Sequence, residues 1–413
     1  MIRRLSVVSI LFAVSGMCSA AAPACQFERL PVGAQKLGAW IDKSNWLALE
    51  HQRLTLQYGE VFMPAWRLQP PDKVVPPPAR LRPIDDFPAL DPLDGRPNKL
   101  AFLLDSRLYA DGLVVLSNGR LVAERYRNGL QPEKPRLLLE ATRPWLNLLG
   151  AISMSTGKLA ADKAVSRYLP AFNGAAGLRK LSVQRLLENE EAHAWSAEDL
   201  RSWWQAAGWV GAQPAAVRPW LMQAGRWDKP LAERQGNDPG AGPDDELLAW
   251  LLAESNRQAL SRLFCEQLMV RNRPEHPVLW LSDAEGVELA AGLAMSLRDF
   301  AKLGQELIEA RGSRGRIPAW FIETLTASSG LRSGEIKGLA KGSEARYGFV
   351  HLGGTANRVA LIGSYGSSLY IDFDQRLVVA IYASYPGANT PSLLATLSEV
   401  WKTLRHEIPK RAP

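Results

Sequence analysis

The stretch that decides the fold begins at Glu140-Ala141-Thr142-Arg143, continues through an apolar segment at 145–152, and ends in Gly157-Lys158-Leu159-Ala160-Ala161-Asp162-Lys163-Ala164-Val165-Ser166-Arg167-Tyr168-Leu169-Pro170. The apolar segment and the glycine stop signal predict a helix that starts near Glu140 and runs towards Thr156. Glu140 and Arg143 are spaced i,i+3, so both side chains fall on one face of that helix, one turn apart.

Strand patterns lie on both sides of this helix. Residues 111–116 and 121–126 are rich in β-forming residues, and the turn between them contains Asn118-Gly119, which supplies the positive φ of a tight hairpin turn. A second hairpin is predicted from 369–373 and 377–382, and an amphipathic helix at 393–404. Early strands, a helical middle and late strands indicate an α+β fold whose antiparallel sheet is built from both chain ends and packed with helices.

The segment 157–170 resembles the "G-K-L-x-x-D-x-x-V-S-x-Y-L-P" segment of the β-lactamase and penicillin-binding-protein superfamily. Further segments resemble the same family in the same order, at 111–129, 181–187, 297–305, 347–349 and 363–372. The long leader before the first hairpin is similar to the 6-aminohexanoate-dimer hydrolase branch. The resemblance covers about residues 101–405 and implies a serine hydrolase of β-lactamase-like fold.

The domain organisation follows from these segments. Residues 1–20 are predicted to be a signal peptide, and 21–100 a leader with two helices and a proline-rich connector. Residues 101–405 form the β-lactamase-like domain. Within it, 101–165 and 340–405 are expected to make the sheet lobe, and 166–339 a mostly helical lobe.

The resemblance implies a reactive serine and lysine in an S-x-x-K motif at the start of the helix. Counting back from Gly157 places Glu140 at the serine position and Arg143 at the lysine position. Arginine stays protonated and cannot accept the nucleophile's proton. The family's tyrosine falls on Gly240, and the cation of its third motif is missing before Gly363. We therefore expect no intact catalytic residues, and a structural ion pair between Glu140 and Arg143.

Other candidate residues carry weaker signals. Ser155-Thr156-Gly157-Lys158 spells S-x-x-K at the wrong end of the helix, and His351-Leu352-Gly353 lies one strand too early for the third motif. His193 ends a polar run and is expected in a solvated loop. Trp195, Trp203 and Trp204 belong to a tryptophan-rich stretch that either lines a binding groove or forms the core of an insertion.

The N-terminus predicts export. Basic residues, a short apolar run and small residues at 18–21 are typical of a signal peptide, so a periplasmic or secreted location is expected. Cleavage leaves Cys25 and Cys265, which in an oxidising compartment are expected to form a disulfide. The formal charge of +7 is scattered along the chain, which argues against nucleic-acid binding. No metal motif, cofactor motif or membrane-spanning segment is predicted.

These observations favour an exported homologue of the family that has lost catalysis and binds a cell-wall fragment or an envelope protein. Two alternatives stay open. One is an active hydrolase whose nucleophile has moved, for example to Ser153 or Ser155, and the other is a structural subunit.

Overall fold

The structure is a computed structural model. It describes residues 25–33, 36–70, 74, 76–172, 175–188, 191–211, 215–233, 242–269, 273–312, 315–327, 336–354 and 357–410. The expected signal peptide at 1–20 and Gly240 lie outside these residues. None of the helices within them is long and apolar enough to span a bilayer.

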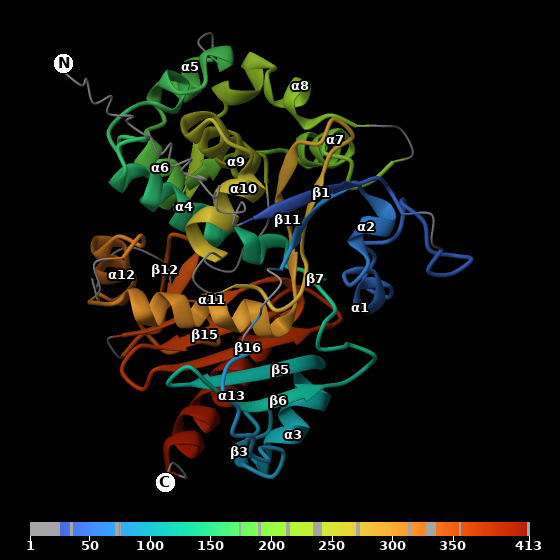
Figure 1. Cartoon of the computed structure of the whole chain (residues 1–413), viewed down its shortest axis with the longest axis vertical. Coiled ribbons are helices and arrows are strands. Elements are labelled where there is room, and N and C mark those ends of the chain that lie inside the picture. Colours follow the sequence, from blue (N-terminus) through green and yellow to red (C-terminus); the bar gives the residue numbers. More distant parts are fainter. Residues whose placement is uncertain are drawn as a thin grey trace, which may run out of the picture.

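A seven-stranded antiparallel sheet forms the lower half of the molecule in Figure 1. Both chain ends contribute to it, because β5 pairs with β16 along almost their whole length. The strands in spatial order are β12 (Glu344–Arg346), β13 (Phe349–His351), β14 (Arg358–Ile362), β15 (Ser368–Asp372), β16 (Leu377–Ala383), β5 (Ala110–Ser117) and β6 (Arg120–Tyr126).

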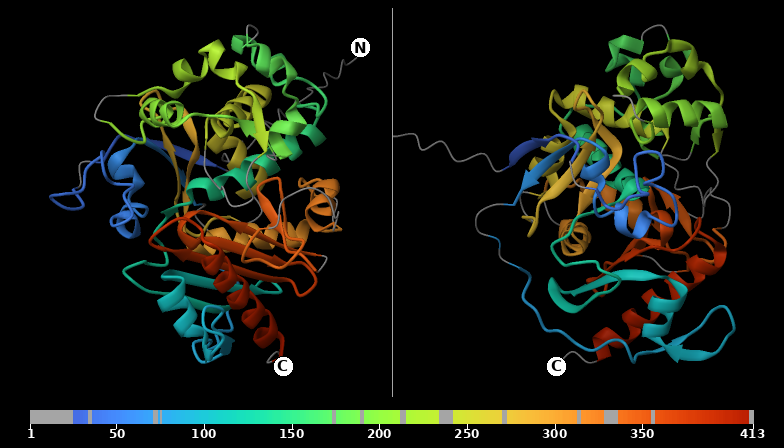
Figure 2. Two further views of the ribbon diagram at one scale, coloured as in Figure 1. Left: turned by 180° about the vertical axis from the view of Figure 1, so that it is seen from behind. Right: turned by 90° about the vertical axis from the view of Figure 1, so that its right-hand side faces the viewer.

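Helices cover both faces of this sheet (Figures 1 and 2). Successive side chains of a strand point to opposite faces, and both faces are apolar here. Tyr382 stacks on Phe300 of α11 (Leu297–Ala310), with ring centroids 5.7 Å apart. Tyr370 stacks on Trp401 of α13 (Pro391–Lys410) at 5.4 Å. The alternation of large apolar residues on the central strands therefore fixes the order helix, sheet, helix.

The two predicted hairpins are present in this sheet. In the turn between β5 and β6, Asn118 has a φ of 51° and Gly119 a φ of 74°, the left-handed values that the Asn-Gly pair predicts. The late hairpin pairs β15 with β16 from Ser368–Ile381 to Asp372–Leu377. The α+β fold expected from the sequence is confirmed.

A second sheet of five strands lies in the upper half, within and beside the stretch that the sequence pattern describes as mainly helical. Its order is β1 (Gln26–Leu30), β2 (Ala65–Gln69), β10 (Val278–Ser282), β11 (Glu288–Met295) and β7 (Arg136–Leu137). β11 reads Glu-Leu-Ala-Ala-Gly-Leu-Ala-Met, a composition that favours helix. Pairing with β10 overrides that preference. Gly292 allows the close approach, since a Cβ there would lie 2.6 Å from the Leu281 carbonyl oxygen.

The leader is part of the fold. Its proline-rich connector runs beside β6, where Arg80 and Arg82 donate backbone hydrogen bonds to Leu121 and Val122. A disulfide joins Cys25, just before β1, to Cys265. The leader is thereby fixed at both of its ends.

Short helices fill the rest of the molecule. The remaining α-helices are α1 (Gln52–Thr55), α2 (Gly59–Phe62), α3 (Leu100–Phe102), α4 (Arg143–Ser155), α5 (Ala176–Lys180), α6 (Val183–Glu188), α7 (Ala197–Ala206), α8 (Val217–Leu221), α9 (Pro243–Asn256), α10 (Leu260–Phe264) and α12 (Ala319–Thr326). Two small hairpins pair β3 (Pro88–Leu90) with β4 (Pro97–Lys99), and β8 (Glu191–His193) with β9 (Leu231–Glu233).

Candidate functional site

The start of α4 meets the loop between β14 and β15. A short 3-10 turn, Leu139–Thr142, precedes the helix and carries Glu140. Gly363 packs against the next residue so closely that a Cβ on it would lie 2.9 Å from the Cβ of Ala141. The neighbouring Ser364 donates a hydrogen bond from Oγ to Oε2 of Glu140 at 2.5 Å. Glycine at 363 therefore allows a hydroxyl and a carboxylate from distant parts of the chain to meet.

Tyr365 extends this group of polar residues. Its backbone is left-handed, with a φ of 60°, which places a half-buried phenol beside Glu140. Burial raises the pKa of Tyr365, the negative charge of Glu140 raises it further, and Arg136 opposes both. Glu140 therefore lies next to two hydroxyl groups that stay protonated at neutral pH.

Arg143 is a buried residue at the first turn of α4. Its side chain is 5% exposed. The guanidinium forms an ion pair with Asp245 of α9, donates to the Leu186 carbonyl oxygen, and donates from Nε to Oδ1 of Asn147 at 3.0 Å. These contacts connect α4 to α6 and α9. The expected partner of Arg143 was Glu140, whereas the structure gives the two side chains different partners. The reason is burial, because a buried guanidinium needs a carboxylate that is buried with it.

The residue before Asp245 holds a second buried pair. Oδ1 of Asp244 lies 2.6 Å from Nδ1 of His193, and its Oδ2 accepts a hydrogen bond from Nε1 of Trp195 at 2.6 Å. The ring of Trp227 stands edge-on to the imidazole at 5.1 Å. The prediction of a solvated loop histidine was wrong, because His193 is 4% exposed.

Comparisons with known proteins agree on the fold. No protein-family model matches the chain. It is 22% identical over 295 residues to the 6-aminohexanoate-dimer hydrolase of Paenarthrobacter ureafaciens, which covers 68% of this chain and 74% of the relative. A solved Bacillus anthracis structure, described provisionally as a 6-aminohexanoate-dimer hydrolase, superposes with a TM-score of 0.74 at 20% identity, covering 90% of this chain and 97% of that one. A β-lactamase/D-alanine carboxypeptidase from Pseudomonas syringae gives 0.51 at 12% identity, covering 73% and 98%.

The chain has the β-lactamase-like fold. The resemblance to the β-lactamase and penicillin-binding-protein superfamily, and to its 6-aminohexanoate-dimer hydrolase branch, is confirmed.

In this fold the motif positions inferred from the sequence fall at one place. Glu140 and Gly363 are in contact through Ala141 and Ser364, and Arg143 lies one turn along α4. Gly240 is outside the described residues. The nearest described residue is Gly242, the N-cap of α9, whose backbone N–H donates to Oδ2 of Asp245 at 3.4 Å. What the β-lactamase-like fold brings together here is a carboxylate, two hydroxyl groups and a buried guanidinium.

The two serines considered as relocated nucleophiles lie elsewhere on α4. Ser153 is 1% exposed, donates to the Leu149 carbonyl oxygen and accepts from Asn256. Ser155 ends the helix and accepts from Nε1 of Trp320 at 3.2 Å. His351 is buried on β13, and burial lowers its pKa. These contacts support structural roles for the three residues.

The tryptophans divide between core and surface. Trp203 is 1% exposed and belongs to the main hydrophobic cluster, so the structure does not place it on a groove. Trp204 is 38% exposed, and Trp195 is tied to Asp244. Among the described residues, no group of three or more His, Cys, Asp or Glu side chains is arranged to hold a metal ion.

Sequence analysis did not single out Ser364 or the acidic residues at the start of α9. The run Asp244-Asp245-Glu246 was a signal of sorts, because three acids in the first turn of an apolar helix are more than a helix dipole requires. Ser364 had no such signal. It lies 224 residues from its partner Glu140, and only the fold brings the two together.

Proposed function

We propose that this protein is an exported, β-lactamase-related protein that does not form an acyl-enzyme at the family position and that acts by binding a cell-wall fragment or an envelope protein. The observation that carries the proposal is the set of contacts made by Arg143. A residue at the lysine position of S-x-x-K would have to accept a proton from the nucleophile. Arg143 is permanently charged, is buried, and donates to three acceptors.

Glu140 supports the same proposal. A carboxylate attacking an acyl group would form an anhydride, which water hydrolyses readily, and not a stable ester intermediate. Its hydrogen bond from Ser364 gives it a positioning contact. A half-buried carboxylate between two hydroxyl groups is suited to accept hydrogen bonds from a polar ligand.

Export rests on the residues at 1–20 and is supported by the disulfide, since such bonds persist in oxidising compartments. N-terminal sequencing of protein recovered from the periplasmic fraction should find a chain that starts shortly after residue 20. Recovery of the full-length chain in the cytoplasm would contradict export.

One observation favours a second candidate function. Ser364 and Glu140 form a hydroxyl–carboxylate pair at 2.5 Å, and a carboxylate that accepts a hydroxyl proton can activate that oxygen as a nucleophile. In this alternative, Ser364 attacks a carbonyl carbon, its proton passes to Glu140, and the leaving group departs with that proton. The nucleophile would have moved to Ser364, and not to Ser153 or Ser155.

Intact-protein mass spectrometry separates the two functions. The mature protein is incubated with a penicillin and, separately, with a fluorophosphonate. We expect no adduct, because a nucleophile, a proton acceptor and oxyanion donors are needed together. A stoichiometric adduct that is lost in Ser364→Ala but kept in Ser155→Ala would establish the second candidate.

Restoring the motif gives a further check. The double variant Glu140→Ser with Arg143→Lys should remain poorly reactive, because the members of a catalytic group act as a unit. Binding is tested by co-sedimentation of the mature protein with purified peptidoglycan. Retention that does not change in Glu140→Gln or Ser364→Ala would place ligand binding away from this site.

A further inference from the structure

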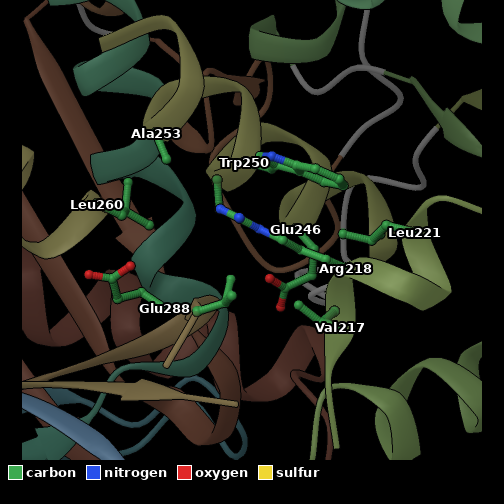
Figure 3. Close-up of a pocket in the computed structure, with 10 residues that line it drawn as sticks. Val217, Arg218, Leu221, Glu246, Trp250, Ala253, Leu260 and Glu288 are labelled. Atoms are coloured by element: carbon green, nitrogen blue, oxygen red, sulfur yellow. The ribbon is translucent and has the colours of Figure 1, made fainter. Parts of the chain in front are cut away.

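A pocket lies beside α9, one residue further round the helix from the Arg143–Asp245 pair (Figure 3). α8, α9, α10 and the start of β11 form its walls. Its empty volume is about 310 Å³, which includes the open mouth. The side chains that decide its chemistry are Glu246, Glu288, Arg218, Trp250, Ala249 and Ala253.

Glu246 is the unusual residue of this pocket. It is 2% exposed. Its Oε2 accepts the backbone N–H of Ala290 at 3.0 Å, while Oε1 has no hydrogen-bond partner among the described residues. A buried polar atom without a partner costs about 1–3 kcal/mol, and native proteins rarely leave one so. The unpaired oxygen belongs to a side chain that lines the pocket, where a bound group can reach it.

A second carboxylate lies on the opposite wall. Oε1 of Glu288 accepts a hydrogen bond from Oγ of Ser261 at 2.7 Å, which fixes the orientation of its carboxyl group. In Figure 3 both carboxylates face the space between α9 and β11. Two carboxylates on facing walls favour a positively charged guest.

Arg218 is the cation of the pocket wall, and its charge is directed elsewhere. The guanidinium lies over the ring of Trp250, 5.0 Å from the centroid, and its Nη2 is 4.0 Å from Glu254 at the exposed end of α9. Nε of Arg218 is buried without a hydrogen-bond partner in the described chain. The remaining wall is apolar, with Ala249 and Ala253 leaving room along α9.

We propose that this pocket binds a small primary ammonium group carried on a short alkyl chain. The ammonium donates to the free oxygen of Glu246 and lies within the field of Glu288, while the alkyl carbons lie against the alanines of α9. This site is distinct from the one around Glu140, and the inference does not depend on the proposed function.

The protonation of Glu246 makes binding pH-dependent. Burial raises the pKa of Glu246 to about 8, the charges of Asp245 and Asp283 raise it further, and the Ala290 N–H opposes the shift. Glu288 faces it from β11, and Arg218 from α8. At neutral pH the carboxyl is therefore largely protonated, and an ammonium ion must displace that proton. Affinity should rise from pH 6 to pH 8.5, where alkylammonium ions are still charged.

Isothermal titration calorimetry of the mature protein tests the proposal. Ethylammonium chloride is titrated at pH 6 and pH 8.5, at constant ionic strength set with NaCl, and sodium propionate and propanol serve as anionic and neutral ligands of similar size. We expect saturable binding of ethylammonium alone, at least 10-fold tighter at pH 8.5.

Three variants locate the site. Glu246→Gln should weaken ethylammonium binding at least 10-fold, and Ala253→Leu should weaken it by filling the pocket. Glu285→Gln removes an exposed charge nearby and should change nothing. Glu246→Gln should melt no lower than the wild type, so a loss of binding would not reflect unfolding. Absence of saturable binding, equal binding by Glu246→Gln, or preference for propionate would each overturn the proposal, the first by showing that an ordered water alone satisfies Glu246.

Discussion

Asp245 and Glu246 are consecutive acidic residues on α9, and the protein treats them differently. Asp245 is paired with the buried guanidinium of Arg143, whereas Glu246 has only a backbone N–H on one of its oxygens. Adjacent helix residues point about 100° apart, so the two side chains enter different environments. The comparison shows that a buried carboxylate takes its character from what its helix face meets, and not from its position in the sequence.

Removal of Arg143 should produce the largest effect on the paired side. Arg143→Met leaves the Asp245 carboxylate buried without its cation, so we expect a loss of about 3–5 kcal/mol in the free energy of unfolding. Chemical denaturation measures it. Arg143→Met combined with Asp245→Leu should recover most of the loss, and Arg167→Met, at an exposed position, should change stability by about 0.5 kcal/mol or less. A loss below 1 kcal/mol in Arg143→Met would show that the pair is not buried as described.

The disulfide lies on the side of Glu246, because Cys265 directly follows α10, which forms a wall of the pocket. The sulfurs join residues 240 positions apart. Replacing both cysteines by serine should reduce stability by about 2–5 kcal/mol, because the bond constrains the unfolded chain. Thiol titration of the denatured, unreduced mature protein should find no free thiol, and two free thiols would disprove the bond.

Glu246 should make stability depend on pH. Its folded pKa of about 8 lies above the ordinary value of 4.5, so between these values the folded state holds the proton more tightly than the unfolded state. Stability is therefore complete below about pH 4.5 and falls as the pH rises through 8, by at most about 1.4 kcal/mol per pH unit.

Glu246→Gln, which cannot ionise, should remove this dependence. Urea denaturation at a series of pH values should find the variant more stable than the wild type by on the order of 2–3 kcal/mol at pH 8, and equal to it near pH 4.5. Asp283→Asn is not a suitable control because Asp283 acts on the same carboxyl, so Glu285→Gln is used. Parallel profiles for wild type and Glu246→Gln would rule out a shifted pKa.

The smallest effect is expected at the half-exposed Glu140. Ser364→Ala removes one charge-assisted hydrogen bond, and we expect a loss of about 0.5–1.5 kcal/mol, reduced by solvent. Glu140→Gln should lower the melting temperature slightly. If Glu140→Gln instead abolished a measurable hydrolytic activity, the carboxylate would be catalytic and the proposed function would be wrong.

The sequence by itself determined the features that depend on local geometry and on residue order. Asn118-Gly119 specified a hairpin because those residues tolerate positive φ, and the alternating apolar residues of β15 and β16 specified strands buried on both faces. The order of the family segments was enough to identify the β-lactamase-like fold. The positions of Glu140, Arg143 and Gly363 within that fold also followed from counting along the chain.

The tertiary structure alone decided which polar groups became partners. A helix-favouring composition became strand β11 because its backbone could pair with β10, and His193 was buried because Asp244 could accept from it inside the core. Arg143 and Asp245 are 102 residues apart, and Glu140 and Ser364 are 224 apart. Local pattern carries no information about such distances. The energy of burying a charge depends on what lies within a few ångströms of it, and that is fixed only when the helices and sheets have packed.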